Sequence, residues 1–130
     1  MDIKEVTEIF EQEFSIIKEK FSCHDLLFSD GKCPFHEKYI APGVYVFWKD
    51  YKVWKVGRHL INSRKRALQH ITDNTCSKDK TYRMEDFAKD MNAHLLLFNV
   101  MKETDRHWVA ALEIFLESKL DPAIKSGRLG

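Results

Sequence analysis

Two short runs of β-branched and aromatic residues, close together in the chain, limit its fold more than any other feature. The runs are Val44–Trp48 and Val53–Val56, and the segment Asp50–Lys52 lies between them. Runs of this kind favour strands, and a short break between two of them predicts a β-hairpin. Side chains alternate between the faces of a strand, so a loop with an odd number of residues would place Tyr45 and Lys55 on the same face.

Helical periodicity and then polar breaks mark the chain before this hairpin. Apolar residues at three- to four-residue spacing predict an amphipathic helix over residues 3–22. Residues 23–41 contain turn-forming residues and are expected to form a loop-rich connector. We therefore divide the chain into an N-terminal helix and connector, 1–41, and a main domain, 42–130.

Two helices are expected directly after the hairpin. Asn62 has the side chain of a helix cap, and a helix is predicted over residues 63–71. Residues 73–83 are polar and are expected to form a loop, and residues 84–91 are expected to form a short helix.

The remaining chain predicts one strand and one long helix. The uninterrupted apolar run 93–100 is typical of a central buried strand. Asp105 is expected to cap a helix over 106–120 that ends before Asp121 and Pro122. The order of elements predicts an α+β domain in which helices flank a small, mainly antiparallel, three-stranded sheet, with an extra N-terminal helix.

Composition places the chain among single-domain globular proteins. It has 130 residues, of which 44% are hydrophobic, and no apolar stretch approaches the roughly 18 residues that a membrane-spanning helix needs. The N-terminus lacks the order of a secretory signal, and the three cysteines cannot all pair within the chain. We therefore expect reduced thiols, no membrane partner and a cytoplasmic location.

Positive charge is concentrated around the hairpin and the helix that follows it. The segment Lys49–Arg83 has ten Lys or Arg and three Asp, a balance of +7, although the net charge of the chain is only +1. Such asymmetry favours a face that binds a polyanion. A solvated basic surface without a partner is the alternative.

Four motifs follow one another in the order and spacing of one nuclease family. They are Gly43-Val44-Tyr45 on the first strand, Lys55-Val56-Gly57 on the second, Arg66 with His70 on the next helix, and Ala111-Leu112-Glu113 with Pro122 at the end. Over about residues 42–125 the chain resembles the GIY-YIG nucleases. The resemblance implies a fold of the class predicted above.

The resemblance also implies a metal-dependent endonuclease that hydrolyses DNA phosphodiester bonds. Tyr45 would be the general base toward the attacking water, and Arg66 would bind the scissile phosphate with its planar guanidinium. Glu113 would be the ligand of one Mg²⁺ or Mn²⁺ ion. His70 would polarise Tyr45 or accept its proton. RNA as a substrate and a homodimer as the assembly both stay open.

The chain departs from the family pattern in three places. Lys55 replaces the tyrosine of the second motif, as in some restriction enzymes of the family, and its charge would favour the ionised form of Tyr45. The gap before Arg66 is one residue longer than usual, which makes Arg64 a rival, and only the pairing with a histidine four residues later favours Arg66. The family's asparagine after the proline is missing, and Lys125 and Ser126 occupy that stretch.

Several basic residues are expected to contact nucleic acid near this site. They are Arg58, His59, Arg64, Lys65 and Lys125.

Two glutamates of the last predicted helix compete for the metal. A buried stripe is expected at Val109, Leu112, Leu116 and Leu120. Glu113 borders this stripe, whereas Glu117 is expected to lie further toward solvent. We therefore predict Glu113 as the ligand.

The cysteines and histidines of the connector suggest a second metal hypothesis. Cys23, His24, Cys33 and His36 are four residue types that bind zinc. Adjacent Cys and His rarely bind one ion together, so buried thiols and surface imidazoles are the favoured interpretation.

Three functions therefore compete. The first is an active endonuclease, and the second is a GIY-YIG-like module that binds nucleic acid without cutting it, which the loss of the asparagine and the change to Lys55 would favour. The third is a protein-interaction module in which the motif matches are coincidence. The basic segment coincides with the motif-bearing hairpin and helix, which argues against the third.

Overall fold

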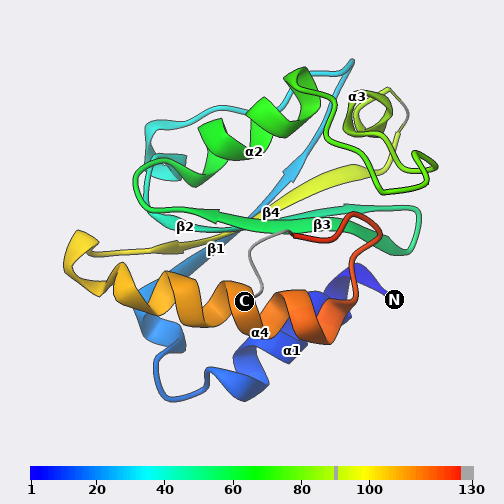
Figure 1. Cartoon of the computed structure of the whole chain (residues 1–130). Helices are drawn as coiled ribbons and strands as arrows, with labels where there is room; N and C mark the ends of the chain where they lie inside the picture. The colour runs from blue at the N-terminus through cyan, green and yellow to red at the C-terminus, as the bar shows by residue number, and fades with distance from the viewer. Residues whose placement is uncertain (90, 127–130) are drawn as a thin grey trace.

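A four-stranded antiparallel sheet forms the centre of the molecule (Figure 1). The computed structural model describes residues 1–89 and 91–126. The strands in sheet order are β1 (Phe21–Leu27), β4 (Ala93–Val100), β2 (Gly43–Lys49) and β3 (Lys52–His59). The α+β class and the central position of 93–100 are confirmed, whereas the predicted number of three strands is wrong.

The missed strand, β1, lies within the residues predicted as helix and connector. Helix α1 (Ile3–Glu13) ends well before residue 22, and β1 pairs with β4 along its whole length. β1 is an edge strand whose middle residues, 22–25, are polar or partly exposed, so its sequence lacks the apolar pattern of a buried strand. Residues 1–41 thus add a helix and a strand to the sheet of the predicted domain 42–130, whose last four positions lie outside the described residues.

Helices cover both faces of the sheet in two layers (Figure 1). α1 and α4 (His107–Leu120) lie on one face, and α2 (Ser63–Thr72) and α3 (Met84–Phe87) lie on the other. Short 3-10 helices occupy connections at Lys18–Lys20, Glu37–Tyr39 and Glu103–Asp105. None of the described helices is both long and apolar enough to cross a membrane.

The helix boundaries agree with the sequence at α2 and differ at α3 and α4. The side chain of Asn62 caps α2, as predicted, by accepting a hydrogen bond from the backbone N–H of Lys65. Asp105 does not cap α4, because it ends a 3-10 helix and Arg106 precedes the first turn of α4. α4 stops at Leu120 as predicted, whereas α3 is only four residues long and position 90 of the predicted helix 84–91 is not described.

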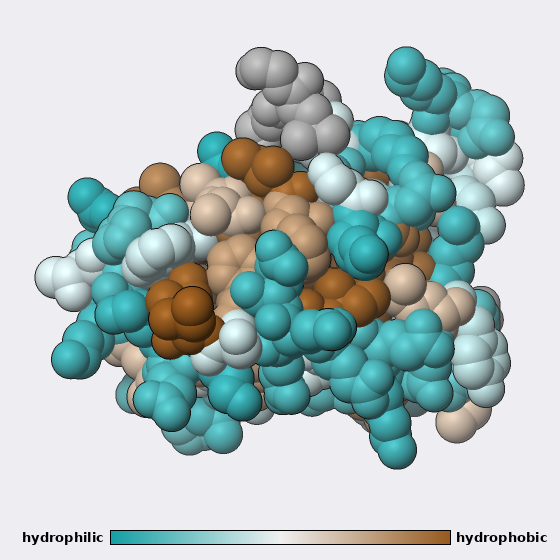
Figure 2. All heavy atoms as spheres, turned by 90° about the horizontal axis from the view of Figure 1, so that it is seen from below, coloured by the Kyte–Doolittle hydropathy of each residue, from teal (hydrophilic) through white to brown (hydrophobic). Residues whose placement is uncertain are grey.

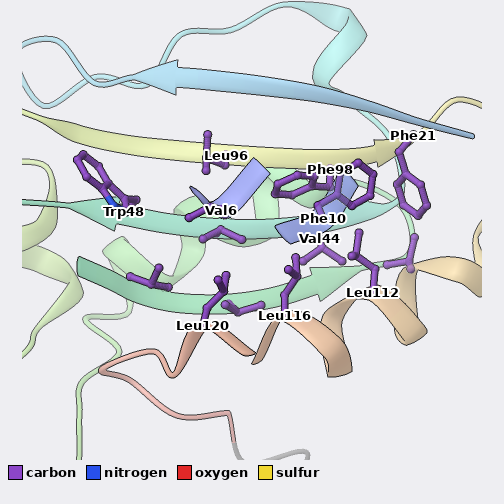
Figure 3. Close-up of a cluster of buried hydrophobic side chains, with 14 of the residues drawn as sticks. Val6, Phe10, Phe21, Val44, Trp48, Leu96, Phe98, Leu112, Leu116 and Leu120 are labelled. Atoms are coloured by element: carbon purple, nitrogen blue, oxygen red, sulfur yellow. The ribbon is translucent and has the colours of Figure 1, made fainter. Parts of the chain in front are cut away.

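The face of the sheet under α1 and α4 is a closed apolar core (Figure 3). The centroid of the Phe10 ring lies 4.9 Å from the centroid of the Phe98 ring and 5.6 Å from that of the Phe21 ring. Leu112 and Leu116 of α4 are fully buried on the same face. Burial of each such side chain contributes roughly 1.5–3 kcal/mol. Figure 2 shows the outer side of these helices, where hydrophilic residues surround apolar side chains in the middle.

The turn of the β2–β3 hairpin differs from the prediction, yet Tyr45 and Lys55 do share a face. The turn residues are Asp50 and Tyr51, both with positive φ, so the loop is even in length. A β-bulge next to Phe47 inserts one extra residue into β3 and reverses the parity. Lys55 then pairs with Phe47 and Gly57 with Tyr45, on the face that α2 covers.

Candidate active site

A small cleft lies at the open end of strand β3, between α2 and the segment that follows α4. Its volume is about 350 Å³. Its lining consists of Tyr45, Lys55, Gly57, Arg58, His59, Arg66, His70 and Ser126. Six of these eight residues were predicted as catalytic or as contacts to nucleic acid. Tyr45, Lys55, Arg58 and His59 come from the β2–β3 pair, and Arg66 and His70 come from α2. A larger cavity, of about 710 Å³, lies between β1 and α3 and is lined by none of the predicted residues.

Gly57 makes room for the tyrosine of the cleft. The two residues are paired across β2 and β3, and the Tyr45 ring lies over the glycine. A Cβ at position 57 would be 2.3 Å from the Tyr45 Oη atom and 2.4 Å from its Cζ. Any side chain there would displace the ring. The glycine of the second motif is therefore a packing requirement of Tyr45, whose side chain is 1% exposed.

Tyr45 begins a chain of hydrogen bonds that leads away from the cleft. Its hydroxyl lies 2.8 Å from His70 Nε2, and His70 Nδ1 lies 2.8 Å from Thr75 Oγ1. When Nδ1 carries the ring proton, it donates a hydrogen bond to Thr75 Oγ1. Nε2 then accepts a hydrogen bond from the Tyr45 hydroxyl. Thr75 was missed in the sequence, because it lies in the predicted loop 73–83 and has no motif of its own. Its placement five residues after the histidine is the only signal.

The structure separates the two rival arginines of α2. Arg66 lines the cleft, and its Nη1 donates to Gln69 Oε1 at 3.1 Å. Arg64 points to the connector instead, where it donates to the backbone oxygens of Pro34 and Cys33, both at 2.9 Å. Its guanidinium also lies 5.1 Å from the centre of the Phe35 ring. Arg64 therefore ties the connector to α2 and is not at the cleft.

The segment after α4 returns along the open edge of β3 and forms one wall of the cleft (Figure 1). Its backbone N–H groups at 123 and 124 donate to the oxygens of Val53 and Trp54 at 3.1 and 2.8 Å. Ile124 bridges to Lys55, which is 6% exposed, and Ser126 reaches the cleft. The edge of β3 is thus covered up to residue 55, and the cleft opens beyond it.

Glu113 lies behind the cleft and reaches it through an arginine. Its carboxylate is 4% exposed, and Oε1 accepts a hydrogen bond from Arg58 Nη1 at 2.5 Å. Arg58 lines the cleft and was predicted to contact phosphate. A charge-assisted pair of this kind orients both side chains. Arg58 is therefore engaged with the predicted metal ligand, which the sequence did not indicate.

Glu117 is buried to the same degree as Glu113, so the prediction that it lies further toward solvent is wrong. Both are 4% exposed, because residues four apart share one helix face and the returning C-terminal segment covers that face. Glu117 Oε1 accepts a hydrogen bond from the Ser126 N–H at 2.8 Å. Its Oε2 is buried and accepts no hydrogen bond from the residues that the structure describes.

The oxygens of α4 suit a hard divalent cation. Mg²⁺ and Mn²⁺ are commonly held by one or two carboxylates, with water and substrate phosphate completing the shell. Glu113 offers a buried carboxylate, and Glu117 Oε2 is a buried oxygen without a described hydrogen-bond donor. No group of three or more His, Cys, Asp or Glu side chains that could hold a metal occurs within residues 1–89 and 91–126. The described donor set thus comprises two carboxylates, so an ion held by them would take its remaining ligands from water or substrate.

The four residues of the zinc hypothesis do not form such a group. His24 and His36 both pack beside the Tyr39 ring, with centroids 5.0 and 6.2 Å from it. Cys23 is exposed, contrary to the expected buried thiol, although desolvation by neighbouring atoms and the nearby Glu11 raise the pKa of its thiol to about 11. Burial also raises the pKa of Cys33, against a lowering by Arg64. Within residues 1–89 and 91–126, the four side chains therefore do not gather into a set of metal ligands.

The other predicted contacts to nucleic acid lie around the cleft with different partners. His59 lines it, and its Nδ1 accepts hydrogen bonds from the N–H groups of Ile61 and Asn62 at 3.2 and 3.0 Å. Lys65 is exposed on α2. Lys125 forms an ion pair with Asp121 and is not among the cleft-lining residues. His59 thus fixes the loop before α2, while Lys65 remains available at the surface.

Comparison with known proteins finds no family model that matches the chain, and no match among curated proteins or solved structures. The function must therefore be inferred from the cleft itself.

Proposed function

We propose that this protein is a metal-dependent endonuclease that hydrolyses phosphodiester bonds, with DNA as its substrate. The observation that carries the proposal is the 2.8 Å contact between Tyr45 Oη and His70 Nε2, inside a cleft that Lys55 and Arg66 also line. A tyrosine hydroxyl that is hydrogen-bonded to a histidine, with two cationic side chains nearby, suits a reaction that needs a base and an anion-binding group. The resemblance to the GIY-YIG nucleases supports the same assignment.

Tyr45 and His70 would move the proton of the attacking water. His70 Nε2 accepts the proton of the Tyr45 hydroxyl, while the Nδ1–H of His70 stays hydrogen-bonded to Thr75 Oγ1. The phenolate oxygen then takes a proton from the water that attacks phosphorus. Lys55, on the same face of the hairpin, favours the phenolate by its charge. As the water oxygen bonds to phosphorus, the P–O bond to the leaving oxygen breaks and that oxygen takes a proton from solvent. The imidazolium formed at His70 then releases its proton to solvent.

Arg66 would bind the phosphate that is attacked. A guanidinium presents two parallel N–H donors to two phosphate oxygens, which an ammonium group does not. Its bond to Gln69 leaves the side chain at the cleft. Negative charge grows on the phosphate oxygens during attack, so Arg66 binds the transition state more tightly than the ground state.

Glu113 would hold the divalent cation behind the cleft, where Arg58 already lies against its Oε1. When bound, such an ion neutralises charge on the phosphate and stabilises the leaving oxygen. Arg58 keeps the carboxylate in a fixed position before an ion binds.

The Arg58–Glu113 pair also supports a second candidate, a module that binds nucleic acid without cutting it. A guanidinium 2.5 Å from Glu113 competes with a metal for the same carboxylate. If the ion cannot share this group, the cleft would hold phosphate through Arg66 and Lys55 and stop there.

Plasmid incubated with the protein and Mg²⁺ or Mn²⁺ separates these candidates. Nuclease function predicts nicking that Arg66→Ala and Glu113→Ala both abolish, while Arg64→Ala, on the same helix but away from the cleft, retains it. Binding that weakens steeply with salt, with no cutting under either metal, would support the second candidate and overturn the first. Parallel assays on duplex and single-stranded RNA test the choice of DNA.

A further inference from the structure

Glu117 is a buried carboxylate that the proposed chemistry does not use. It lies on α4, is 4% exposed, and was not part of the motif in the sequence. Among the described residues, its Oε2 is the buried side-chain oxygen or nitrogen atom without a hydrogen-bond partner. In native structures nearly all buried polar atoms have a hydrogen-bond partner, so this exception indicates a ligand at Oε2.

The described surroundings of Glu117 compensate its charge only in part. Oε1 accepts one bond, from the backbone N–H of Ser126 at 2.8 Å. No Lys, Arg or His of residues 1–89 and 91–126 forms an ion pair with it. Burial of a charged carboxylate without a cation is costly. A cation at Oε2 would remove that cost.

Glu117 and Glu113 lie on one buried face of α4, behind the cleft. They are four residues apart on α4, so their Cβ atoms are about 5–6 Å apart, a spacing from which two carboxylates can converge on one ion. Each contacts a residue that lines the cleft, Arg58 for Glu113 and Ser126 for Glu117. Each carboxylate is therefore connected to the cleft through one residue that lines it.

We propose that Glu117 is a second carboxylate ligand of the divalent cation, beside Glu113. The inference rests on the proposed function, since it concerns the cation of the same cleft. The bond from the Ser126 N–H to Oε1 orients the carboxylate, and Oε2 is the oxygen that binds the ion. Two carboxylates give the ion a protein site before substrate arrives, which one carboxylate shared with Arg58 would do poorly.

Glutamine at position 117 separates this role from a structural one. The amide oxygen of Glu117→Gln still accepts the Ser126 N–H, so the C-terminal segment keeps its anchor. Only the charge and one anionic oxygen are lost. Without metal, Glu117→Gln should unfold at the same temperature as the wild type or higher, because an uncompensated buried charge has been removed.

The test measures Mn²⁺ binding in the absence of DNA, either by calorimetry or by the EPR signal of the free ion. We expect one Mn²⁺ per chain for the wild type, at least tenfold weaker binding for Glu117→Gln and for Glu113→Gln, and no change for Glu8→Gln, an exposed glutamate of α1. Wild-type affinity in Glu117→Gln overturns the inference, and so does a wild type that binds no Mn²⁺.

Plasmid cleavage by the same proteins separates this inference from the nuclease proposal. If the wild type nicks DNA and Glu117→Gln binds Mn²⁺ normally, the nuclease stands and the second ligand is overturned. If both glutamates are needed for Mn²⁺ but no variant cuts under any condition, the cation site stands and the nuclease is overturned.

Discussion

The two faces of the central sheet are built from the same strands and differ in what they enclose. Under α1 and α4, Val44 and Val46 of β2 meet phenylalanines and leucines in a closed core (Figure 3). Under α2, Tyr45 lies between them in sequence but faces His70 and the cleft. Both faces thus carry an apolar core, and strand alternation adds a polar cleft at the edge of the face under α2. Substitutions on the two faces should therefore have separable effects.

Phe10→Ala should give the largest loss of stability. The ring is 1% exposed and contacts the rings of Phe21 and Phe98, so its removal should lower the free energy of unfolding by about 3–5 kcal/mol. Urea unfolding measures this. The comparison further predicts that the folded fraction keeps its cleavage rate per molecule. A cleavage rate that falls more than the folded fraction would show that the two faces are coupled.

Gly57→Ala should damage both properties, because the glycine joins the sheet to the cleft. Its new Cβ would lie 2.3 Å from Tyr45 Oη, so the ring must shift, at a cost of about 1–3 kcal/mol, and leave His70. Both the free energy of unfolding and the rate of plasmid cleavage should fall. The same change in a Tyr45→Leu background should cost less stability, since the clash is gone. Equal costs in the two backgrounds would refute the packing role of Gly57.

Thr75→Val should affect only the cleft. It removes the partner of His70 Nδ1 while keeping the shape of the side chain, and loss of such a supporting bond weakens a site about tenfold or more. Cleavage should fall about tenfold with a nearly unchanged melting temperature. Thr72→Val, on exposed α2 surface nearby, is the control. Unchanged cleavage in Thr75→Val would mean that His70 needs no second partner.

Lys125→Ala should have the smallest effect. The hydrogen bond and charge of Lys125 hold the pKa of Asp121 below its ordinary value. A carboxyl whose pKa is lower in the folded state adds stability above its unfolded pKa and loses it as the pH falls through the folded pKa. Because Asp121 is fully exposed, the change should be visible only as an NMR titration of its carboxyl that moves back to higher pH. An unmoved titration would refute this pairing.

Local sequence patterns predicted the elements that carry the cleft. The hairpin, the cap at Asn62 and the end of α4 are confirmed, because each depends on neighbours in the chain. β1 was missed, since an edge strand gains its structure from pairing with β4 and not from its own apolar pattern. The strand with which β1 pairs lies some seventy residues further along the chain, so local periodicity does not reveal the pairing.

The site shows the same division. Tyr45, Lys55, Arg66 and His70 line one cleft, an arrangement that the family resemblance had implied. The pair between Arg58 and Glu113 and the burial of Glu117 depend on how α4 and the segment after it lie against β3. Helical position alone placed Glu117 toward solvent, because it does not include the chain that returns to cover the helix.

Single-turnover cleavage of supercoiled plasmid by the wild type and Tyr45→Phe, with Mn²⁺ and Mg²⁺, tests the central claim most directly. Removal of the hydroxyl next to His70 takes away the proposed base, so the rate should fall by about 10²–10⁴-fold while the fold, followed by circular dichroism, is kept. A Tyr45→Phe protein that cuts at the wild-type rate, or a wild type that does not cut with either metal, would contradict the account.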